Sequence, residues 1–202
     1  ATGQLVDGVQ YGFQLPDRSI GRVNGNWVLL DQPTPGGANA APSGLGNPLN
    51  VRLNEWLANT DGPDWIELYN LDPLPVNLAG MVLTDDPSLA GLTNHSIGPL
   101  TFIDGRGWVL WIADDEITAG PDHLPFRLDA LGETVRLYTA SQAIADSVDL
   151  LVQLSELAEG RFPDGNTVIV RFPHTASPGE ANCLANETDA DHDTLPDDWE
   201  LS

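Results

Sequence analysis

The stretch Asp64-Trp65-Ile66-Glu67-Leu68-Tyr69-Asn70 alternates in polarity with a period of two. Ile66 and Leu68 share one parity, whereas Trp65, Glu67 and Tyr69 share the other. Successive side chains of a β-strand point to opposite faces of its sheet. The alternation therefore predicts a strand with one core face and one mixed outer face.

Short apolar runs of the same kind recur on both sides of this strand, separated by Gly, Pro, Asp and Asn. The runs that we predict as strands are 51–57, 65–70, 81–84, 108–113, 134–138, 145–152 and 168–172. Residues 108–113 are apolar at both parities, which predicts a strand covered on both faces. Short strands with turns between them predict an all-β fold of the β-sandwich type.

Part of the sequence occurs twice. Six residues of the N-terminal part recur in the same order 139 residues later, namely Asp7, Val9, Gln14, Leu15, Gly21 and Arg22 as Asp146, Val148, Gln153, Leu154, Gly160 and Arg161. Pro-Gly-Gly-Ala-Asn at 35–39 recurs as Pro-Gly-Glu-Ala-Asn at 178–182, now 143 residues apart. A period of this size is about one ordinary domain and indicates a modular protein.

The repeat predicts four segments. Residues 1–39 form the C-terminal part of a preceding repeat, 40–48 a linker, 49–182 a complete domain, and 183–202 an acidic tail. Strands in the first segment would lack their sheet partners, and unpaired strand edges bind other edges. We therefore expect the first segment to dock on the complete domain or on a neighbour, and head-to-tail docking between chains could grow an open fibre.

Charge limits the choice of partner. The 202 residues include 30 Asp and Glu against 8 basic residues, all of them Arg, for a net charge of −22. Such a surface repels nucleic acids and anionic lipids and attracts divalent cations, although an acidic surface can also serve solubility alone. No apolar run approaches the ~20 residues that cross a bilayer, so no membrane insertion is expected. The single cysteine, Cys183, cannot form a disulfide within the chain.

Six motifs occur in order with the spacing of one domain. They are Leu53-Asn54-Glu55, residues 64–70, 76–86, Gly132-Glu133-Thr134-Val135-Arg136-Leu137, Asp146-Ser147-Val148 and Gly160-Arg161-Phe162-Pro163-Asp164-Gly165. Together they resemble a known family, the lamin tail domain in its bacterial form. The resemblance covers nearly all of 50–182 and implies an immunoglobulin-like β-sandwich. It further implies an extracellular or cell-surface location in a large secreted bacterial protein, often in tandem with other modules, and no catalytic residues. Residues 4–39 resemble the end of such a domain.

The acidic tail contains a spaced set of oxygen ligands. Counting from Asp189, side-chain oxygens and one main-chain carbonyl fall at positions 1, 3, 5, 7, 9 and 12, which are Asp189, Asp191, Asp193, Leu195, Asp197 and Glu200. This is the spacing of a twelve-residue calcium loop. The loop resembles the EF-hand-like and thrombospondin type 3-like repeats of secreted proteins. Thr194 stands where such loops have Gly, so weak affinity or a merely solvated acidic tail are alternatives.

Other candidate sites are weaker. Glu55 and Glu67 lie on neighbouring predicted strands and could act as acid and base, but no nucleophile or third ligand accompanies them, so a structural role is the simpler interpretation. Trp56 and Trp65 are the tryptophans best placed to be partly exposed and to stack on a sugar, with core packing as the alternative. The four His residues show no zinc-ligand spacing.

These patterns predict a function without catalysis. We expect a structural or adhesive module of an extracellular protein, stabilised by calcium, whose partners are other copies of itself or neighbouring modules of the parent protein. The alternative is an accessory module that binds a glycan or a peptide beside an extracellular enzyme.

Overall fold

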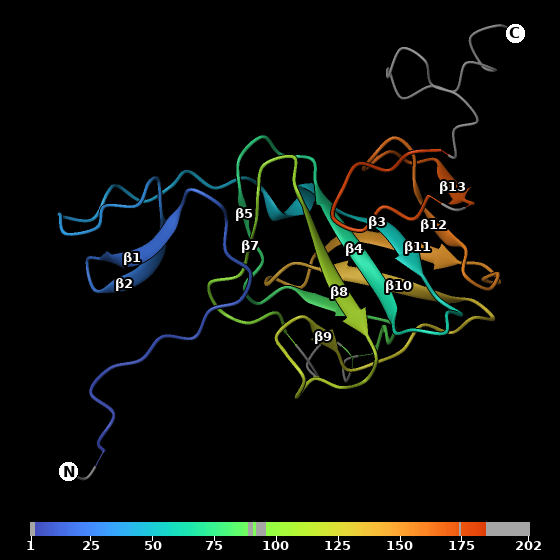
Figure 1. The fold of residues 1–202 in the computed structure, drawn as a ribbon, viewed down its shortest axis with the longest axis horizontal. Helices are drawn as coiled ribbons and strands as arrows, with labels where there is room; N and C mark the ends of the chain where they lie inside the picture. The colour runs from blue at the N-terminus through green and yellow to red at the C-terminus, as the bar shows by residue number, and fades with distance from the viewer. Residues whose placement is uncertain (1–2, 89–90, 92–95, 174, 185–202) are drawn as a thin grey trace, which may run out of the picture.

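The computed structural model describes residues 3–88, 91, 96–173 and 175–184. The fold is all-β, as the sequence predicted, and consists of several mostly antiparallel sheets (Figure 1). Within these residues, no helix has the length and apolar character needed to span a membrane.

The largest sheet has six strands. Its order is β13 (Ile169–Phe172), β12 (Ala158–Arg161), β3 (Val51–Leu57), β4 (Asp64–Asn70), β8 (Trp108–Ala113) and β9 (His123–Leu124). Neighbouring strands are antiparallel except for β8 and β9. The short 3-10 turn η1 (Pro48–Asn50) leads into β3.

Two smaller sheets complete this part of the fold. One has the order β11 (Ile144–Leu150), β10 (Glu133–Tyr138) and β6 (Val82–Thr84), and the other pairs β5 (Val76–Asn77) with β7 (Phe102–Ile103). In Figure 1 the long strands β10 and β11 pass behind β4 and β8. The main core cluster lies between the six-stranded and the three-stranded sheet. It contains buried side chains of both sheets, among them Leu53 and Ile66 of the first and Val135 and Val148 of the second.

A β-bulge in β3 decides which side chains enter this core. Leu53 pairs with Leu68, but the next pair is Glu55 with Glu67, so Asn54 is an extra residue. A bulge shifts the alternation by one position. Leu53 and Trp56, three residues apart, therefore both point into the main core, and Glu55 lies on the opposite face.

The opposite face of β4 is not the mixed outer face that the sequence predicted. Trp65, Glu67 and Tyr69 are all buried there, because the chain that follows β12 returns over this face. The expected partial exposure of Trp56 and Trp65 is also wrong, since the two side chains are 1% and 8% exposed. Burial in two separate clusters leaves neither indole face free for a sugar.

The predicted strand positions agree closely with the structure. Runs 51–57 and 108–113 coincide with β3 and β8, and the others differ from the observed strands by one or two residues at an end. The two-residue strands β5, β7 and β9 fall outside the predicted runs, as does β12, whose sequence Ala-Glu-Gly-Arg shows no alternation.

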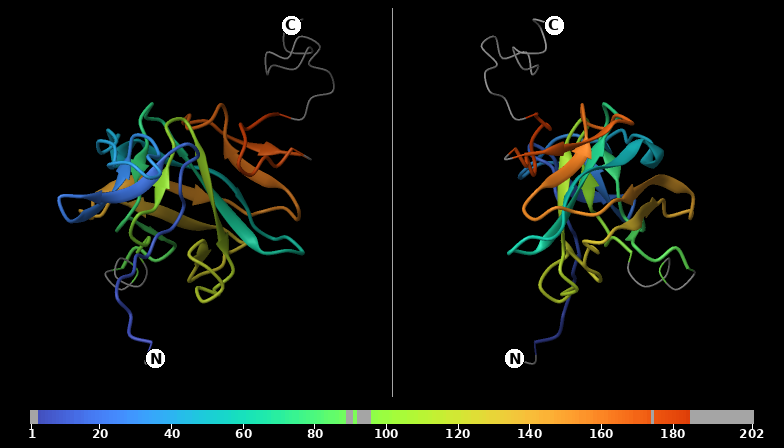
Figure 2. Two further views of the ribbon diagram at one scale, coloured as in Figure 1. Left: turned by 60° about the vertical axis from the view of Figure 1, so that its left-hand side comes forward. Right: turned by 90° about the vertical axis from the view of Figure 1, so that its right-hand side faces the viewer.

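The N-terminal part forms its own hairpin from β1 (Ser19–Val23) and β2 (Asn26–Leu30). Asn24 and Gly25 join the strands with φ values of 51° and 84°, as in a two-residue type I′ turn. The hairpin lies beside β5 and β7 (Figure 1), and the first residues of the chain extend away from the sheets (Figure 2).

Several contacts attach the N-terminal part to the rest of the fold. Phe13 packs edge-on against the core residue Trp111, with ring centroids 5.1 Å apart. The Phe102 N–H donates to the Phe13 carbonyl oxygen at 3.0 Å, and Leu15 packs in one apolar cluster with Phe102 and Leu29. Residues of the N-terminal part therefore contact β7, β8 and the loop before β7.

Candidate functional site

Two buried glutamates form the centre of the site. Glu55 on β3 and Glu67 on β4 are directly opposite each other in the antiparallel register, and both are 0% exposed. The bulge at Asn54 places Glu55 on the same face as Glu67. Like charges opposite each other in a sheet destabilise it, so this arrangement requires compensating hydrogen bonds or protonation.

Residues 177–182, which we name the closing segment, supply hydrogen bonds to both glutamates. The Ser177 N–H donates to Oε1 and Oε2 of Glu55 at 3.2 Å each, and the Ser177 hydroxyl donates to Oε2 at 3.2 Å. The Gly179 N–H donates to Oε2 of Glu67 at 2.6 Å. Gly179 has a φ of +86°, a conformation that favours glycine and turns the closing segment towards β4. The closing segment is thus pinned to two adjacent strands.

The side chain of Asn54 connects the glutamates to the turn after β12. Its Nδ2 donates to Oε1 of Glu67 at 2.9 Å and to Oδ1 of Asp164 at 2.8 Å. Its Oδ1 accepts from the Gly165 N–H at 2.9 Å. The extra residue of the bulge is therefore held by three hydrogen bonds, which satisfy a polar side chain that is fully buried.

Burial changes the acidity of both glutamates. Burial raises the pKa of Glu55 from 4.5 to about 7, and the hydrogen bonds from Ser177 offset only part of the rise. Burial also raises the pKa of Glu67 from 4.5 to about 8, opposed by the hydrogen bonds from Asn54 and Gly179. The negative charge of Glu55 adds to the rise at Glu67. Near neutral pH the pair therefore retains a proton.

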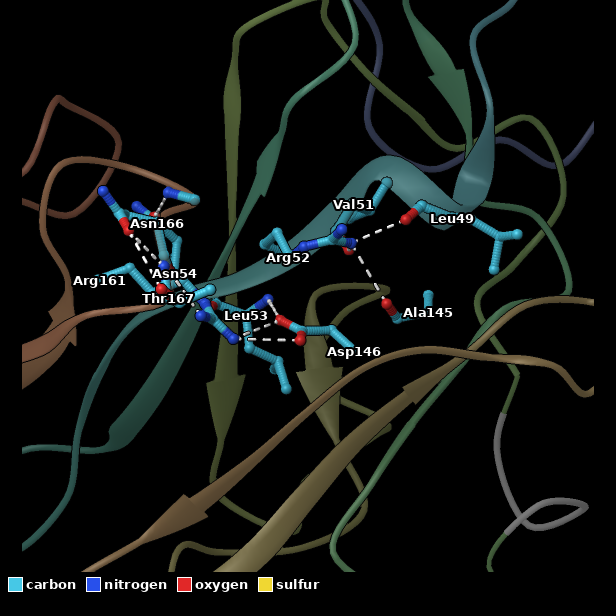
Figure 3. A network of polar contacts seen from close by, with 11 residues as sticks. Leu49, Val51, Arg52, Leu53, Asn54, Ala145, Asp146, Arg161, Asn166 and Thr167 are labelled. Atoms are coloured by element: carbon cyan, nitrogen blue, oxygen red, sulfur yellow. Dashed lines mark hydrogen bonds and ion pairs between the residues drawn. The ribbon is translucent and has the colours of Figure 1, made fainter.

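Arg161 closes the edge of β3 beside the bulge (Figure 3). Its Nε donates to the carbonyl oxygen of Leu53 at 2.7 Å, and one terminal nitrogen donates to the carbonyl oxygen of Asn166 at 2.6 Å. The other terminal nitrogen binds both carboxylate oxygens of Asp146 at 3.0 and 3.1 Å. Asp146 in turn accepts from the Leu53 N–H at 2.9 Å. The ion pair thus takes up the backbone groups that the bulge leaves unpaired.

The N-terminal hairpin repeats part of this arrangement. Arg22 pairs with Asp7 at 2.7 Å, as Arg161 pairs with Asp146. The Asn39 side chain donates to the Arg22 carbonyl oxygen at 3.0 Å, as that of Asn182 donates to the Arg161 carbonyl oxygen at 2.8 Å.

The turns that precede the two asparagines also match. Gly37 donates its N–H to the Thr34 carbonyl oxygen at 3.1 Å, and Glu180 donates to that of Ser177 at 3.0 Å. Gly36, like Gly179, has a positive φ, here 75°. The Arg–Asp pair, the asparagine bond and the glycine turn are therefore common to both copies.

Chemically, this site is a closed set of hydrogen bonds. The four carboxylate oxygens of the two glutamates each accept a hydrogen bond from the chain itself. Within the described residues, no group of three or more His, Cys, Asp or Glu side chains is arranged to hold a metal ion. His123, the histidine with a described environment, lies 2.8 Å from Asp114 on a different part of the sheet.

The residues predicted to bind calcium, from Asp189 to Glu200, lie outside the described residues. Cys183 is exposed and is a free thiol. Comparison with protein-family models, with curated proteins and with solved structures gave no match.

Sequence reasoning named the two glutamates but missed the residues that surround them. Asn54 and Asp164 stand within the segments that resemble the lamin tail domain, but nothing in the sequence marks them as partners of the glutamates, and Ser177 gives no signal of its own. Arg161 and Asp146 did give one, because both belong to the repeat together with Asn182. The repeated polar residues indicate modularity, and in the structure they also contact one another, since each Arg pairs with its Asp and each Asn donates to the Arg carbonyl oxygen.

Proposed function

We propose that this chain is a non-catalytic structural or adhesive module of a large secreted or cell-surface bacterial protein. We assign it to the immunoglobulin-like β-sandwich type of the bacterial lamin tail domain. The all-β fold and the antiparallel sheets on either side of one core support this assignment.

One observation supports a structural role most directly. The buried glutamates, which have the raised pKa values of acid–base groups, use their oxygens to hold the closing segment. Perturbed pKa values occur at catalytic sites, but structural networks perturb them too. Here the carboxylates are 0% exposed and face the chain's own backbone, so a substrate would have to displace residues 177–182 to reach them.

We propose further that calcium binds the acidic tail and stiffens the end of the module. The ligands would be Asp189, Asp191, Asp193, Leu195 through its carbonyl, Asp197 and Glu200. Extracellular calcium modules bind with dissociation constants of about 10⁻⁴ to 10⁻³ M, which suits a structural ion outside the cell.

Isothermal titration calorimetry with calcium tests the metal proposal. The full chain should release or absorb binding heat that a chain ending at Asn182 does not. Asp191→Asn should weaken binding, whereas Asp198→Asn removes the same charge at a position that is not a ligand and should not. Equal heats for the full chain and the shortened chain would refute the calcium site.

Light scattering over a range of concentrations tests the assembly proposal. A module that assembles with other copies should increase in mass with concentration, and a strict monomer at high concentration would remove the fibre. The first repeat would then contact only the rest of its own chain and would not link one chain to another.

A further inference from the structure

By the sequence repeat, β1 of the N-terminal hairpin corresponds to β12. The edge of β12 that faces away from β13 is covered by β3, but the same edge of β1 has no strand beside it in the described part of the chain. In the complete domain β12 lies between β13 and β3, with Gly160 paired to Glu55. The two-stranded sheet of the hairpin contains only β1 and β2, and within the described residues no strand pairs with the other side of β1.

The turn of the hairpin fixes which backbone groups face this open edge. The two-residue turn makes Val23 and Asn26 a hydrogen-bonded pair, so Gly21 and Val28 form the next one. Ile20 and Arg22 therefore direct their N–H and C=O groups away from β2. The Arg22 carbonyl oxygen accepts from Asn39, which leaves three strand groups facing outward.

Further donors at this edge lack the acceptors that their counterparts have. Ser177 and Gly179 donate to Glu55 and Glu67, but within the described part of the chain nothing accepts from the N–H groups of the equivalent Thr34 and Gly36. Arg161 donates through Nε to a backbone carbonyl of β3, whereas the one hydrogen bond that Arg22 donates to the described residues runs from a terminal nitrogen to Asp7.

The segment before the hairpin is unpartnered in the same way. Val9 and Tyr11 correspond to Val148 and Leu150, which are buried in β11 under the main core at 4% exposure each. Val9 is 38% exposed and Tyr11 is 59% exposed. The hairpin and this segment together therefore present a strand edge, free donors and an apolar surface.

We propose that the outer edge of β1 binds a strand of a neighbouring module with the chemistry of β3 and β4. The bound strand runs antiparallel to β1 and places one carboxylate opposite Gly21, where it accepts from Thr34. A second carboxylate on the next strand accepts from Gly36, and a backbone carbonyl accepts from Nε of Arg22. This inference rests on the proposed function as a modular structural protein and names the partner of its first repeat.

A second copy of this chain is a poorer partner. Its own β3 is already covered on both edges, by β12 and by β4. It could offer β3 only by releasing its own closing hairpin and the buried Arg161–Asp146 pair. The two acidic chains, with a net charge of −22 each, would also repel each other.

The test uses the full chain and a fluorescently labelled peptide with the sequence of residues 49–71, which spans β3 and β4. Fluorescence anisotropy should detect binding, and hydrogen exchange should show new protection in residues 18–38. Arg22→Ala should weaken binding about tenfold, as expected for the loss of a charged hydrogen bond. Arg136→Ala, on the other sheet, is the matched control and should not. A peptide with Glu55→Ala and Glu67→Ala should also bind more weakly.

Several results would overturn the proposal. No anisotropy change, or protection of residues 158–182 in place of 18–38, would show that the edge of β1 is not the binding surface. Protection of Ile20 and Arg22 in the chain alone would show that the edge is already covered. If the chain alone showed this protection and light scattering gave a dimer, the edge would be covered by a second copy, and the proposed partner would be wrong. None of these readouts depends on calcium, so the calorimetric test of the proposed function can fail separately.

Discussion

Protonation of the buried glutamates predicts that this protein loses stability as the pH rises. Glu55 has a pKa of about 7 in the folded protein, against 4.5 for an ordinary glutamate. An acid whose pKa is raised on folding contributes stability that is complete below the unfolded pKa. That contribution is lost as the pH rises through the folded pKa, because the folded state then holds a buried charge.

The size of the effect follows from the two pKa values. Between about pH 5 and about pH 9 the contribution of Glu55 alone should fall by about 2.5 kcal/mol. For a protein of this size, this corresponds to a decrease in Tm of roughly 5 to 10 °C. Glu67, with a pKa of about 8, acts in the same direction. The two contributions do not add fully, because ionisation of one carboxylate opposes ionisation of the other.

The assay compares the pH dependence of unfolding for Glu55→Gln and for the wild type. Glutamine cannot ionise, so the variant should lose about 2.5 kcal/mol less than the wild type over this range, whatever fixed cost the substitution adds. Glu180→Gln is the matched control, since it removes one charge from an exposed position of the same closing segment. Parallel curves for wild type and Glu55→Gln would refute the buried charge as the cause.

Three other substitutions test the packing around the site and the docking of the first repeat. Arg161→Ala should lower the free energy of unfolding by about 3 to 5 kcal/mol in denaturant titration, because it removes a buried guanidinium that holds Asp146 and two backbone carbonyl oxygens, whereas Arg171→Ala, at a half-exposed ion pair, should cost about 1 kcal/mol or less. Gly160→Ala should cost about 2 kcal/mol or more in the same assay, because its Cβ would overlap a backbone carbonyl of β3. Phe13→Ala should release the hairpin and speed its limited proteolysis, whereas Tyr11→Ala, at an exposed side chain, should not.

The sequence predicted most of the strands but not which faces they bury. Alternation identified β4 correctly and placed Ile66 and Leu68 in the core. It could not show that the other face of β4 is covered too, because that cover comes from residues after β12, about a hundred positions later in the chain. The bulge at Asn54 is equally invisible to a period of two, and it brings Trp56 into the core.

The same limit applies to the candidate site. Glu55 and Glu67 could be picked out as neighbouring carboxylates, but their meaning depends on Ser177 and Gly179, which pair with them across 122 and 112 residues. Local sequence patterns do not encode contacts at this separation. An internal repeat does encode some of them, because residues that contact one another have to recur together for the same structure to form twice.

Comparing the two copies therefore separates the contacts that the hairpin forms by itself from those that need a further strand. The Arg–Asp pair, the asparagine bond to the arginine carbonyl and the glycine turn all form in the first copy, where no described strand corresponds to β3. The contacts to the two glutamates and to the β3 backbone are missing there, as is the core burial that Val148 and Leu150 have in the second copy. The preformed hairpin would thus need little reordering when it binds a strand, so most of the free energy of the new contacts would appear as affinity.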